Sequence, residues 1–331
     1  MVPRAIDCCG RPTPNHRSEY RNVSWKFGLG ISLGQVTANV LNRGHCCYRR
    51  TVVAGLARRI ALPGSVSLGV LVAGRRRTQP VSPDEHTRYF YMIEISPYLH
   101  VQDIALRVLR DIVPFIKSGN SECSVVDVCT QLLEQYGAKD CWYHDVPALV
   151  LVGERTTLSV SGTDYQPSDV AIRANDLVTI DLSPMVNDFW GDCARSYIVE
   201  SGSVRPPEQS STLDYGIHTE RELHALMKEI ATPETSMHEL YSLINQSIET
   251  MGYKNLDFRG NLGHSIEKHL DDRRYIEANN QTMLGDCNMF TFEPHICRTN
   301  DTWGFKMENI YYFDDAKVAP LGSPQLLEAV S

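Results

Sequence analysis

The order of apolar patterns along the chain most constrains its fold. From Pro97 onward, two stretches with helical spacing of apolar side chains are followed by strand-like stretches, and this order then recurs. The pattern predicts an α+β fold with two similar halves, each with two helices followed by strands. The expected helices cover residues 99–113, 125–136, 218–230 and 237–251, and the expected strands cover 148–152, 176–183, 196–199, 289–293 and 305–313.

Charge divides the chain into two regions. Residues 1–83 hold 13 Lys and Arg but only two acids, a net charge of +11, whereas the remainder has a net charge of −19. We therefore expect a basic, poorly patterned N-terminal extension over residues 1–89 and one folded domain over residues 90–331. An arginine-rich, acid-poor N-terminus is typical of a mitochondrial transit segment, but an unstructured extension or a misplaced start codon gives the same composition.

Cysteine usage and apolar runs indicate the cellular context. The ten cysteines form no C-x-x-C pair, and their scatter is typical of a reducing compartment. The longest apolar run, residues 60–74, contains Pro63 and is too short to cross a bilayer. We expect a cytoplasmic protein, or a mitochondrial one if residues 1–89 are a transit segment. The acidic remainder argues against nucleic-acid binding, and no membrane partner is expected.

Two aspartates lie at the ends of a predicted hairpin. In residues 176–183, Val178, Ile180 and Leu182 alternate with Asp181, so the carboxylate of Asp181 faces away from the apolar side chains. A loop rich in turn residues follows, and Asp192 begins the returning strand. The hairpin would place Asp181 beside Asp192. Two ionised carboxylates that close repel each other unless a cation lies between them.

Three further side chains suited to metal binding follow in the chain. Glu293 lies opposite the two phenylalanines that precede it in a strand-like segment, and Glu308 shares a strand face with Lys306. His264 stands between the aspartates and the glutamates in sequence. Four carboxylates and one imidazole can bind two divalent cations, an arrangement that activates water for hydrolysis.

Short motifs surround these five residues. They comprise Asn-Asp-Leu-Val-Thr-Ile-Asp-Leu at 175–182, the ten-residue gap to Asp192, Gly-His-Ser-Ile within 261–266, Phe-Glu-Pro at 292–294 and Lys-Met-Glu-Asn at 306–309. Together, and in this order over residues 97–315, they resemble the pita-bread metallopeptidases, which include methionine aminopeptidases, Xaa-Pro aminopeptidases and prolidases. The resemblance implies a pita-bread fold, with duplicated helix-helix-strand halves around a curved antiparallel sheet.

The resemblance also implies roles for the five residues. Asp181 would bind one metal ion, His264 and Glu293 would bind the other, and Asp192 and Glu308 would bridge the two. The ions would be Mn, Co, Fe or Zn. A hydroxide bridging them would attack the N-terminal peptide bond of a short peptide, with Glu293 as the general base. The implied activity is that of an aminopeptidase or dipeptidase, with Xaa-Pro peptides as one candidate substrate class.

The chain departs from the family at two substrate-contacting histidines. Alignment of the surrounding motifs places Asp164 and Asp271 at those positions. An aspartate does not replace a neutral imidazole donor at pH 7 unless its pKa is strongly raised. His269 and His295 are the candidate catalytic substitutes. Tyr165 is a candidate for the substrate pocket, although an aromatic core residue explains it equally well.

These departures leave three functions open. The first is a metallopeptidase acting on short peptides. The second is a metal-dependent enzyme that acts on a small non-peptide molecule, using Asp164 or Asp271 in place of imidazoles. The third is a non-catalytic binding protein that kept the fold. A homodimer is compatible with each of them.

Overall fold

The computed structural model describes residues 85–331, with side chains described from residue 95. The expectations for residues 1–84 lie outside this range. The first helix, α1 (Glu85–Asp111), begins before the boundary expected at residue 90 and contains Pro97. Among residues 85–331, no helix combines the length and the apolar character needed to cross a membrane.

The first half of the fold consists of two helices that cover a sheet. α1 and α2 (Glu122–Tyr136) bury their apolar stripes in one core cluster with this sheet. Ser121 caps α2 by accepting a hydrogen bond from the backbone of Ser124, and Gly137 ends it with a φ of 105°. A left-handed φ favours glycine at this position, as the sequence predicts.

The sheet of the first half is antiparallel throughout, in the order β2–β3–β6–β7. Its central pair aligns Asp181 with Ala194 and Leu182 with Cys193, so Asp192 lies just beyond the end of the ladder, next to Asp181. The strands are β2 (Ala148–Val152), β3 (Asp176–Leu182), β6 (Cys193–Glu200) and β7 (Ser203–Arg205).

The segment expected to be a loop between Asp181 and Asp192 contains its own small hairpin. Asn187 and Asp188 form the turn with φ values of 50° and 65°, a conformation that asparagine and aspartate tolerate better than most residues. The hairpin joins a third short strand in the order β1–β4–β5. These strands are β1 (Asp140–Cys141), β4 (Pro184–Val186) and β5 (Phe189–Trp190).

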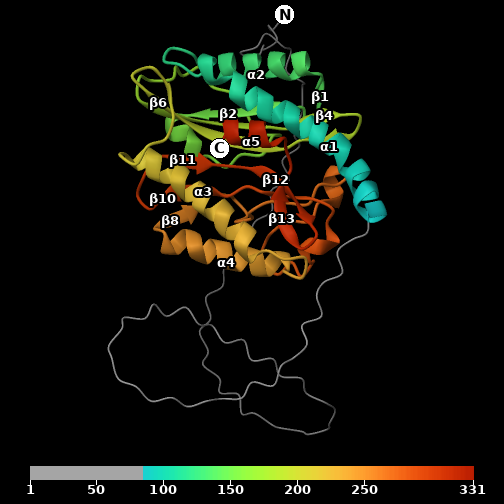
Figure 1. Ribbon diagram of the computed structural model, residues 1–331. Helices are drawn as coiled ribbons and strands as arrows, with labels where there is room; N and C mark the ends of the chain where they lie inside the picture. Colours follow the sequence, from blue (N-terminus) through green and yellow to red (C-terminus); the bar gives the residue numbers. More distant parts are fainter. Residues whose placement is uncertain (1–84) are drawn as a thin grey trace, which may run out of the picture. The chain divides into compact units, whose positions relative to one another are not determined.

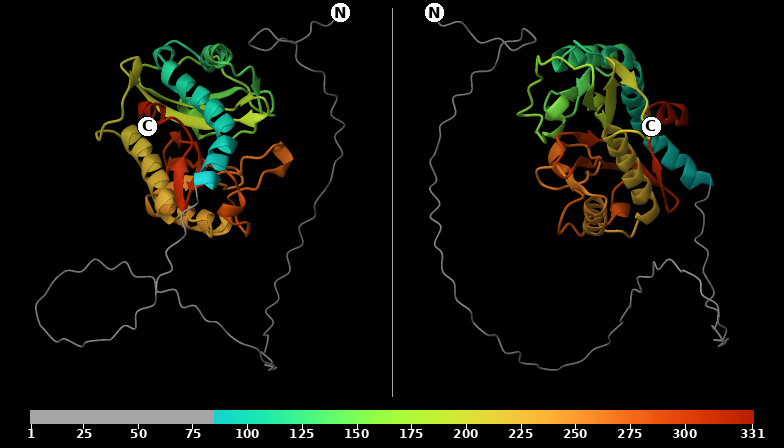
Figure 2. Two further views of the ribbon diagram at one scale, coloured as in Figure 1. Left: turned by 45° about the vertical axis from the view of Figure 1, so that its right-hand side comes forward. Right: turned by 90° about the vertical axis from the view of Figure 1, so that its left-hand side faces the viewer.

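The second half repeats the order of helices and strands. Helices α3 (Thr212–Ile230) and α4 (Met237–Thr250) bury leucine, isoleucine and methionine side chains against the phenylalanines of its strands. Figures 1 and 2 show α2 and α4 at opposite ends of the described fold, with the strands of both halves between them. The strands are β8 (Tyr253–Asn255), β9 (Phe290–Phe292), β10 (His295–Arg298), β11 (Gly304–Lys306), β12 (Asn309–Asp314) and β13 (Lys317–Pro320).

The expected strand 305–313 is divided into two strands that belong to different sheets. β11 pairs with β10, whereas β12 pairs with β9 and β13. At the break, the backbone of Glu308 exchanges hydrogen bonds with Ala194 of the first half, at 3.0 and 3.4 Å. This bridge connects the two halves next to Asp192. The remaining helical elements are η1 (Val113–Phe115), η2 (Gly153–Thr157), η3 (Leu270–Asp272), η4 (Leu284–Asp286) and α5 (Pro324–Ala329).

Candidate metal centre and its pocket

Asp192, His264 and Glu308 form a compact group where the two halves meet. Each offers a ligand atom, and these atoms lie within 4.8 Å of one another. Asp192 is fixed by helix α1, because Gln102 donates its amide nitrogen to the carbonyl of Asp192 and accepts from its backbone nitrogen, both at 2.9 Å. All three residues are buried. The group therefore combines elements distant in sequence, as a prepared binding site requires.

A close backbone approach positions His264. Gly263 has a φ of 141°, and a side chain at this position would lie 2.2 Å from the carbonyl oxygen of Thr291. Nδ1 of His264 donates to the carbonyl of Ser265 at 3.0 Å. Nε2 therefore carries the lone pair, and it faces carboxylate oxygens of Asp192 at 3.4 Å and Glu293 at 3.9 Å. A metal-ligating histidine has this arrangement, with its other nitrogen engaged by an acceptor.

Glu308 provides the test of whether this group fits a cation. Both of its carboxylate oxygens are buried, and neither has a hydrogen-bond partner among the described residues. Burial, with Asp192 and Glu293 nearby, raises the pKa of Glu308 well above its usual value. Burial likewise raises the pKa of Asp192 to about 6, against the opposing effect of His264. Buried carboxylate oxygens that lack hydrogen-bond partners, as those of Glu308 do, suit a divalent cation together with one imidazole.

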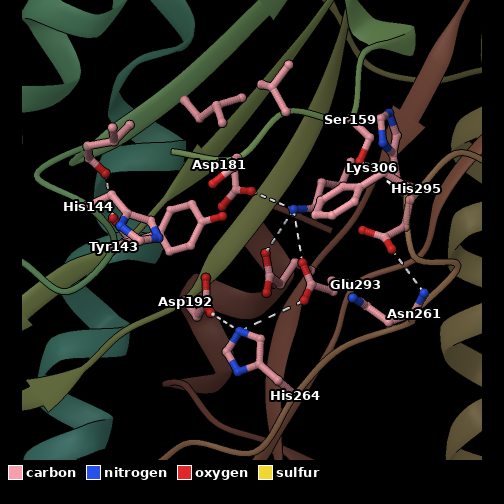
Figure 3. Close-up of a pocket in the computed structure, with 18 of the residues that line it drawn as sticks. Tyr143, His144, Ser159, Asp181, Asp192, Asn261, His264, Glu293, His295 and Lys306 are labelled. Carbon is pink, nitrogen blue, oxygen red and sulfur yellow. Dashed lines mark hydrogen bonds and ion pairs between the residues drawn. The ribbon is translucent and has the colours of Figure 1, made fainter. Parts of the chain in front are cut away.

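Lys306 occupies the centre of the remaining carboxylates. Its Nζ lies 2.5 Å from Asp181, 3.1 Å from Glu293 and 3.6 Å from Glu308. Figure 3 shows it between Asp181 and Glu293, with Asp192 and His264 below them. Burial alone would lower the pKa of Lys306, but the three carboxylates outweigh it and hold the pKa well above its usual value. The ammonium group is therefore a permanent cation within the cluster.

Glu293 stays ionised because of this lysine. Burial would raise its pKa, but the charge of Lys306, aided by His264, lowers the pKa below its usual value. Its Oε1 faces His264, while its Oε2 pairs with Lys306. Glu293 can therefore accept a proton at neutral pH. The sequence indicated that Lys306 shares a face with Glu308, but it did not indicate that the lysine binds the carboxylates.

A pocket of about 260 Å³ opens above this cluster, and all five predicted ligands line it. His295 also lines the pocket, next to Lys306 in Figure 3. Its Nε2 donates to the carbonyl of Thr156 at 2.7 Å, and burial lowers its pKa to about 4. The imidazole is therefore neutral at pH 7, with Nδ1 as its remaining acceptor.

The other predicted substrate residues lie away from this pocket. Asp164, His269 and Asp271 are exposed and do not line it. Tyr165 is buried, and its hydroxyl group binds the backbone nitrogen and oxygen of Val150 at 2.9 and 3.0 Å. The described structure thus brings Glu293 and His295 to the pocket, but not these four residues. Tyr165 takes the alternative position of an aromatic core residue.

Trp142 and Arg273 also line the pocket, in the part that is termed its rim here, and the sequence identified neither residue. The Trp142 ring stacks on Trp190 with 4.7 Å between the ring centres and 7° between the planes. It also lies 5.5 Å from the His264 ring. The guanidinium carbon of Arg273 lies 5.3 Å from the centre of Trp142. These contacts depend on loop conformations, so no spacing in the sequence predicts them.

Comparisons with known sequences find similarity to peptidases. The model of metallopeptidase family M24 matches residues 98–315. An uncharacterised peptidase of Staphylococcus aureus is 25% identical over 203 residues, which are 61% of this chain and 54% of that protein. A Xaa-Pro dipeptidase of Pyrococcus furiosus is 26% identical over 194 residues, which are 59% of this chain and 51% of the relative. The chain thus spans about half the length of these curated relatives.

Solved structures share the fold. An X-Pro aminopeptidase from Thermotoga maritima superimposes with a TM-score of 0.58 at 19% identity, covering 72% of this chain and 64% of that one. A methionine aminopeptidase from the same organism gives a TM-score of 0.55 at 17% identity, covering 69% and 96% of the two chains. These likenesses confirm the pita-bread α+β fold. Because the family model matches well over half of its residues, the chain belongs to metallopeptidase family M24.

Proposed function

We propose that this chain is a metal-dependent peptidase that hydrolyses the N-terminal peptide bond of short peptides. The observation that carries the proposal is the convergence of Asp192, His264 and Glu308 on one point, where neither oxygen of Glu308 has a hydrogen-bond partner among the described residues. Such a group fits a divalent ion. The adjoining Glu293 and the pocket above provide a proton acceptor and room for a substrate.

The remaining candidate ligand, Asp181, bears on the number of ions that the site binds. We propose two, with Asp192, His264 and Glu308 as the tighter set and Asp181 as a ligand of the second ion. In the structure, Asp181 pairs with Lys306 at 2.5 Å. A second cation at Asp181 competes with this ammonium group, so it should bind more weakly than the first. Oxygen-rich donors suit Mn, Co or Fe, and Zn fits the same set.

The residues around the centre determine the course of hydrolysis. A divalent ion held by Asp192, His264 and Glu308 would supply a water nucleophile near neutral pH and would polarise the scissile carbonyl. Glu293 accepts the proton of that water and returns it to the nitrogen of the leaving amine. Lys306 keeps Glu293 ionised for the first of these transfers. Neutral His295 lines the same pocket and is the nearby imidazole suited to contact the substrate.

The charges on the pocket floor favour an N-terminal substrate. When only the tighter of the two proposed ions is bound, the ionised carboxylates of Asp181, Asp192, Glu293 and Glu308 carry one more negative charge than Lys306 and that ion neutralise. The α-ammonium group of a peptide would contribute the remaining positive charge. The relatives include a Xaa-Pro dipeptidase, so Xaa-Pro peptides are the first substrates to examine.

The test is turnover by the purified full chain with each of Mn, Co, Fe and Zn, on a panel of Met-Xaa and Xaa-Pro peptides. We expect release of the N-terminal residue, and Glu293→Gln should lower the turnover by about 10²- to 10⁴-fold while metal remains bound. Absence of turnover with every metal, in a folded and metal-loaded sample, would reject the proposal. Peptide binding without cleavage would instead indicate a binding protein, and turnover of small non-peptide molecules alone a different enzyme.

A further inference from the structure

A second pocket, of about 200 Å³, lies where helix α3 meets strands of both halves. Its walls come from β6, β7 and α3, from residues 306–307 at the end of β11, and from residues 329–331. Lys306 lines this pocket as well as the pocket above the metal centre, so the two pockets share the wall that β11 provides. The second pocket has roughly ten times the space that one ordered water molecule needs, so it has room for a small organic molecule.

Glu220 of α3 gives this pocket a buried acid without a partner. The residue is 1% exposed, and neither of its carboxylate oxygens has a hydrogen-bond partner among residues 95–331. Burial raises its pKa well above the usual value, although the charge of Lys306 opposes this shift. A buried polar group that lacks a partner destabilises the fold. A hydrogen-bond donor of a ligand would therefore be favoured at Glu220.

Arg221, the next residue of α3, is a cation without a partner in the same pocket. Arg195 and Arg205 also line the pocket, but their guanidinium groups are engaged: Nη1 of Arg195 donates to the carbonyl of Glu308 at 2.7 Å, and Nη1 of Arg205 pairs with Asp214 at 2.6 Å. The half-buried Arg221 forms no hydrogen bond or ion pair with any other residue that the structure describes. Burial and the charge of Arg195 lower its pKa, so an anion beside Arg221 would be favoured.

Glu220 and Arg221 do not neutralise each other, although both line the second pocket. No ion pair joins them among the contacts of the described residues. A ligand that carries a cation and an anion close together can pair with both. An ammonium group can donate to the oxygens of Glu220, and a carboxylate matches the planar fork of a guanidinium group such as that of Arg221.

The rest of the lining is mainly aliphatic. Ligand pockets typically combine an apolar lining with a few polar groups that fix the orientation of the ligand. Here, branched or flexible apolar side chains surround the two charged groups, and burial of an aliphatic part of the ligand against them would add affinity. These apolar side chains are Val113, Ile198, Val204, Ile217 and Met307.

We propose that the second pocket binds a free α-amino acid with an aliphatic side chain, with its α-ammonium group at Glu220 and its α-carboxylate at Arg221. The inference goes beyond the proposed function and does not depend on it, since the class of ligand follows from the lining of this pocket. An aliphatic amino acid is also a product of the proposed reaction. Its site would border β11, which carries Lys306 to the metal centre.

The experiment measures binding of L-leucine to the Mn-loaded full chain by titration calorimetry. Glu220→Gln and Arg221→Gln should each weaken binding by about 10- to 100-fold, the range for one charge-assisted hydrogen-bonding pair. The matched controls are Glu222→Gln and Lys228→Gln. Both remove a charge from an exposed position of α3 that does not line the pocket, so the affinity should not change.

Ligand analogues test each end of the bound molecule. 3-Methylbutylamine lacks the carboxylate of leucine, so it should bind more weakly, and Arg221→Gln should weaken it little further. 4-Methylpentanoate lacks the ammonium group and should show the same indifference to Glu220→Gln. Glycine lacks the aliphatic side chain and should bind at least about tenfold more weakly than leucine. Wild-type affinity for any of the three that equals the affinity for leucine would overturn the proposed chemistry of the ligand.

Variants of the two pockets locate the bound leucine. Asp192→Ala disrupts the metal centre and should leave binding at the second pocket intact. Val204→Trp fills the second pocket without altering either charged group, so it should abolish binding even if Glu220→Gln proves to be unfolded. Loss of binding in Asp192→Ala with full binding in Val204→Trp would overturn the inference, as would absence of binding to the folded wild type. Circular dichroism and Tm verify the fold of each variant. Because no measurement requires peptide cleavage, failure of this inference is distinguishable from failure of the proposed function.

Discussion

The floor and the rim of the pocket carry opposite kinds of charged side chain. On the floor, buried carboxylates surround one lysine, and the pKa values of Asp192 and Glu308 are raised chiefly by burial and further by the neighbouring carboxylates. On the rim, Arg273 rests on aromatic rings and has unused donors. The carboxylates of the floor therefore need a cation to balance their charge, whereas the guanidinium group of Arg273 at the rim can bind an anion. Changes in the floor should alter chemistry, and changes in the rim should alter selection of the substrate.

The largest expected effect is on the floor. Asp192→Ala removes one of the three candidate ligands, which are Asp192, His264 and Glu308. We therefore expect loss of bound metal and a fall in activity of more than about 100-fold. Metal content per chain and kcat/KM measure both. The control Asp169→Ala removes an exposed carboxylate and should change neither quantity. Full metal content in Asp192→Ala would show that the assigned ligand geometry is wrong.

The next largest effect is expected for substitutions of Lys306, because its ammonium group forms ion pairs with the carboxylates of the floor. Lys306→Met frees Asp181, so a second ion should bind about tenfold more tightly or better, as seen by titration calorimetry. Lys306→Arg keeps the charge and should retain the weak second site. Unchanged affinity for the second ion in Lys306→Met would mean that Lys306 does not compete at Asp181.

The stabilisation of the protein by a metal ion bound at the floor should depend on pH. The pKa of Asp192 is raised to about 6 in the metal-free fold, above its value of about 3.9 in an unfolded chain. This group therefore stabilises the metal-free protein at low pH, and the stabilisation is lost as pH rises through about 6. A cation needs the ionised carboxylate, so the increase in Tm caused by Mn should grow from pH 5 to pH 7. An increase independent of pH would contradict this linkage.

The smallest effect belongs to the rim. Trp142→Phe keeps an aromatic seat for Arg273 but removes the hydrogen bond to Gly191. One neutral hydrogen bond contributes about 1 kcal/mol, so we expect KM for Ala-Pro to rise by about fivefold or less, with little change in kcat. Steady-state kinetics separate the two constants. A fall in kcat with constant KM would place Trp142 with the floor rather than the rim.

Local patterns predicted the regular elements of the fold well. Apolar spacing and the glycine at 137 defined α2, and β2 has the predicted bounds. The prediction of a single strand over residues 305–313 was wrong, because Glu308 pairs with Ala194 of the other half and interrupts the strand. The small hairpin between Asp181 and Asp192 was missed for a similar reason. Its short strands are paired by tertiary contacts, and their turn residues read as an ordinary loop.

The candidate site likewise contains residues that the sequence predicted and residues that it did not. The five predicted ligands lie in or beside strands whose alternation is visible in the sequence, and all five line one pocket. Lys306 was visible as a neighbour of Glu308, but its ion pairs depend on how the sheets meet. Arg273 and Trp142 lie in irregular segments, where sequence spacing does not set direction. The same limitation applies to His269 and Asp271, which the chain carries to the surface.

The stacked indoles of Trp142 and Trp190 give the protein an optical reporter of its own chemistry. Trp142 is 5.5 Å from the His264 ring, so a paramagnetic ion held there should quench its emission. Near-parallel rings 4.7 Å apart should also give a coupled near-ultraviolet circular dichroism signal that changes when a ligand moves either ring. Ion loading and occupancy of the rim can therefore be followed in solution by light alone, without a label.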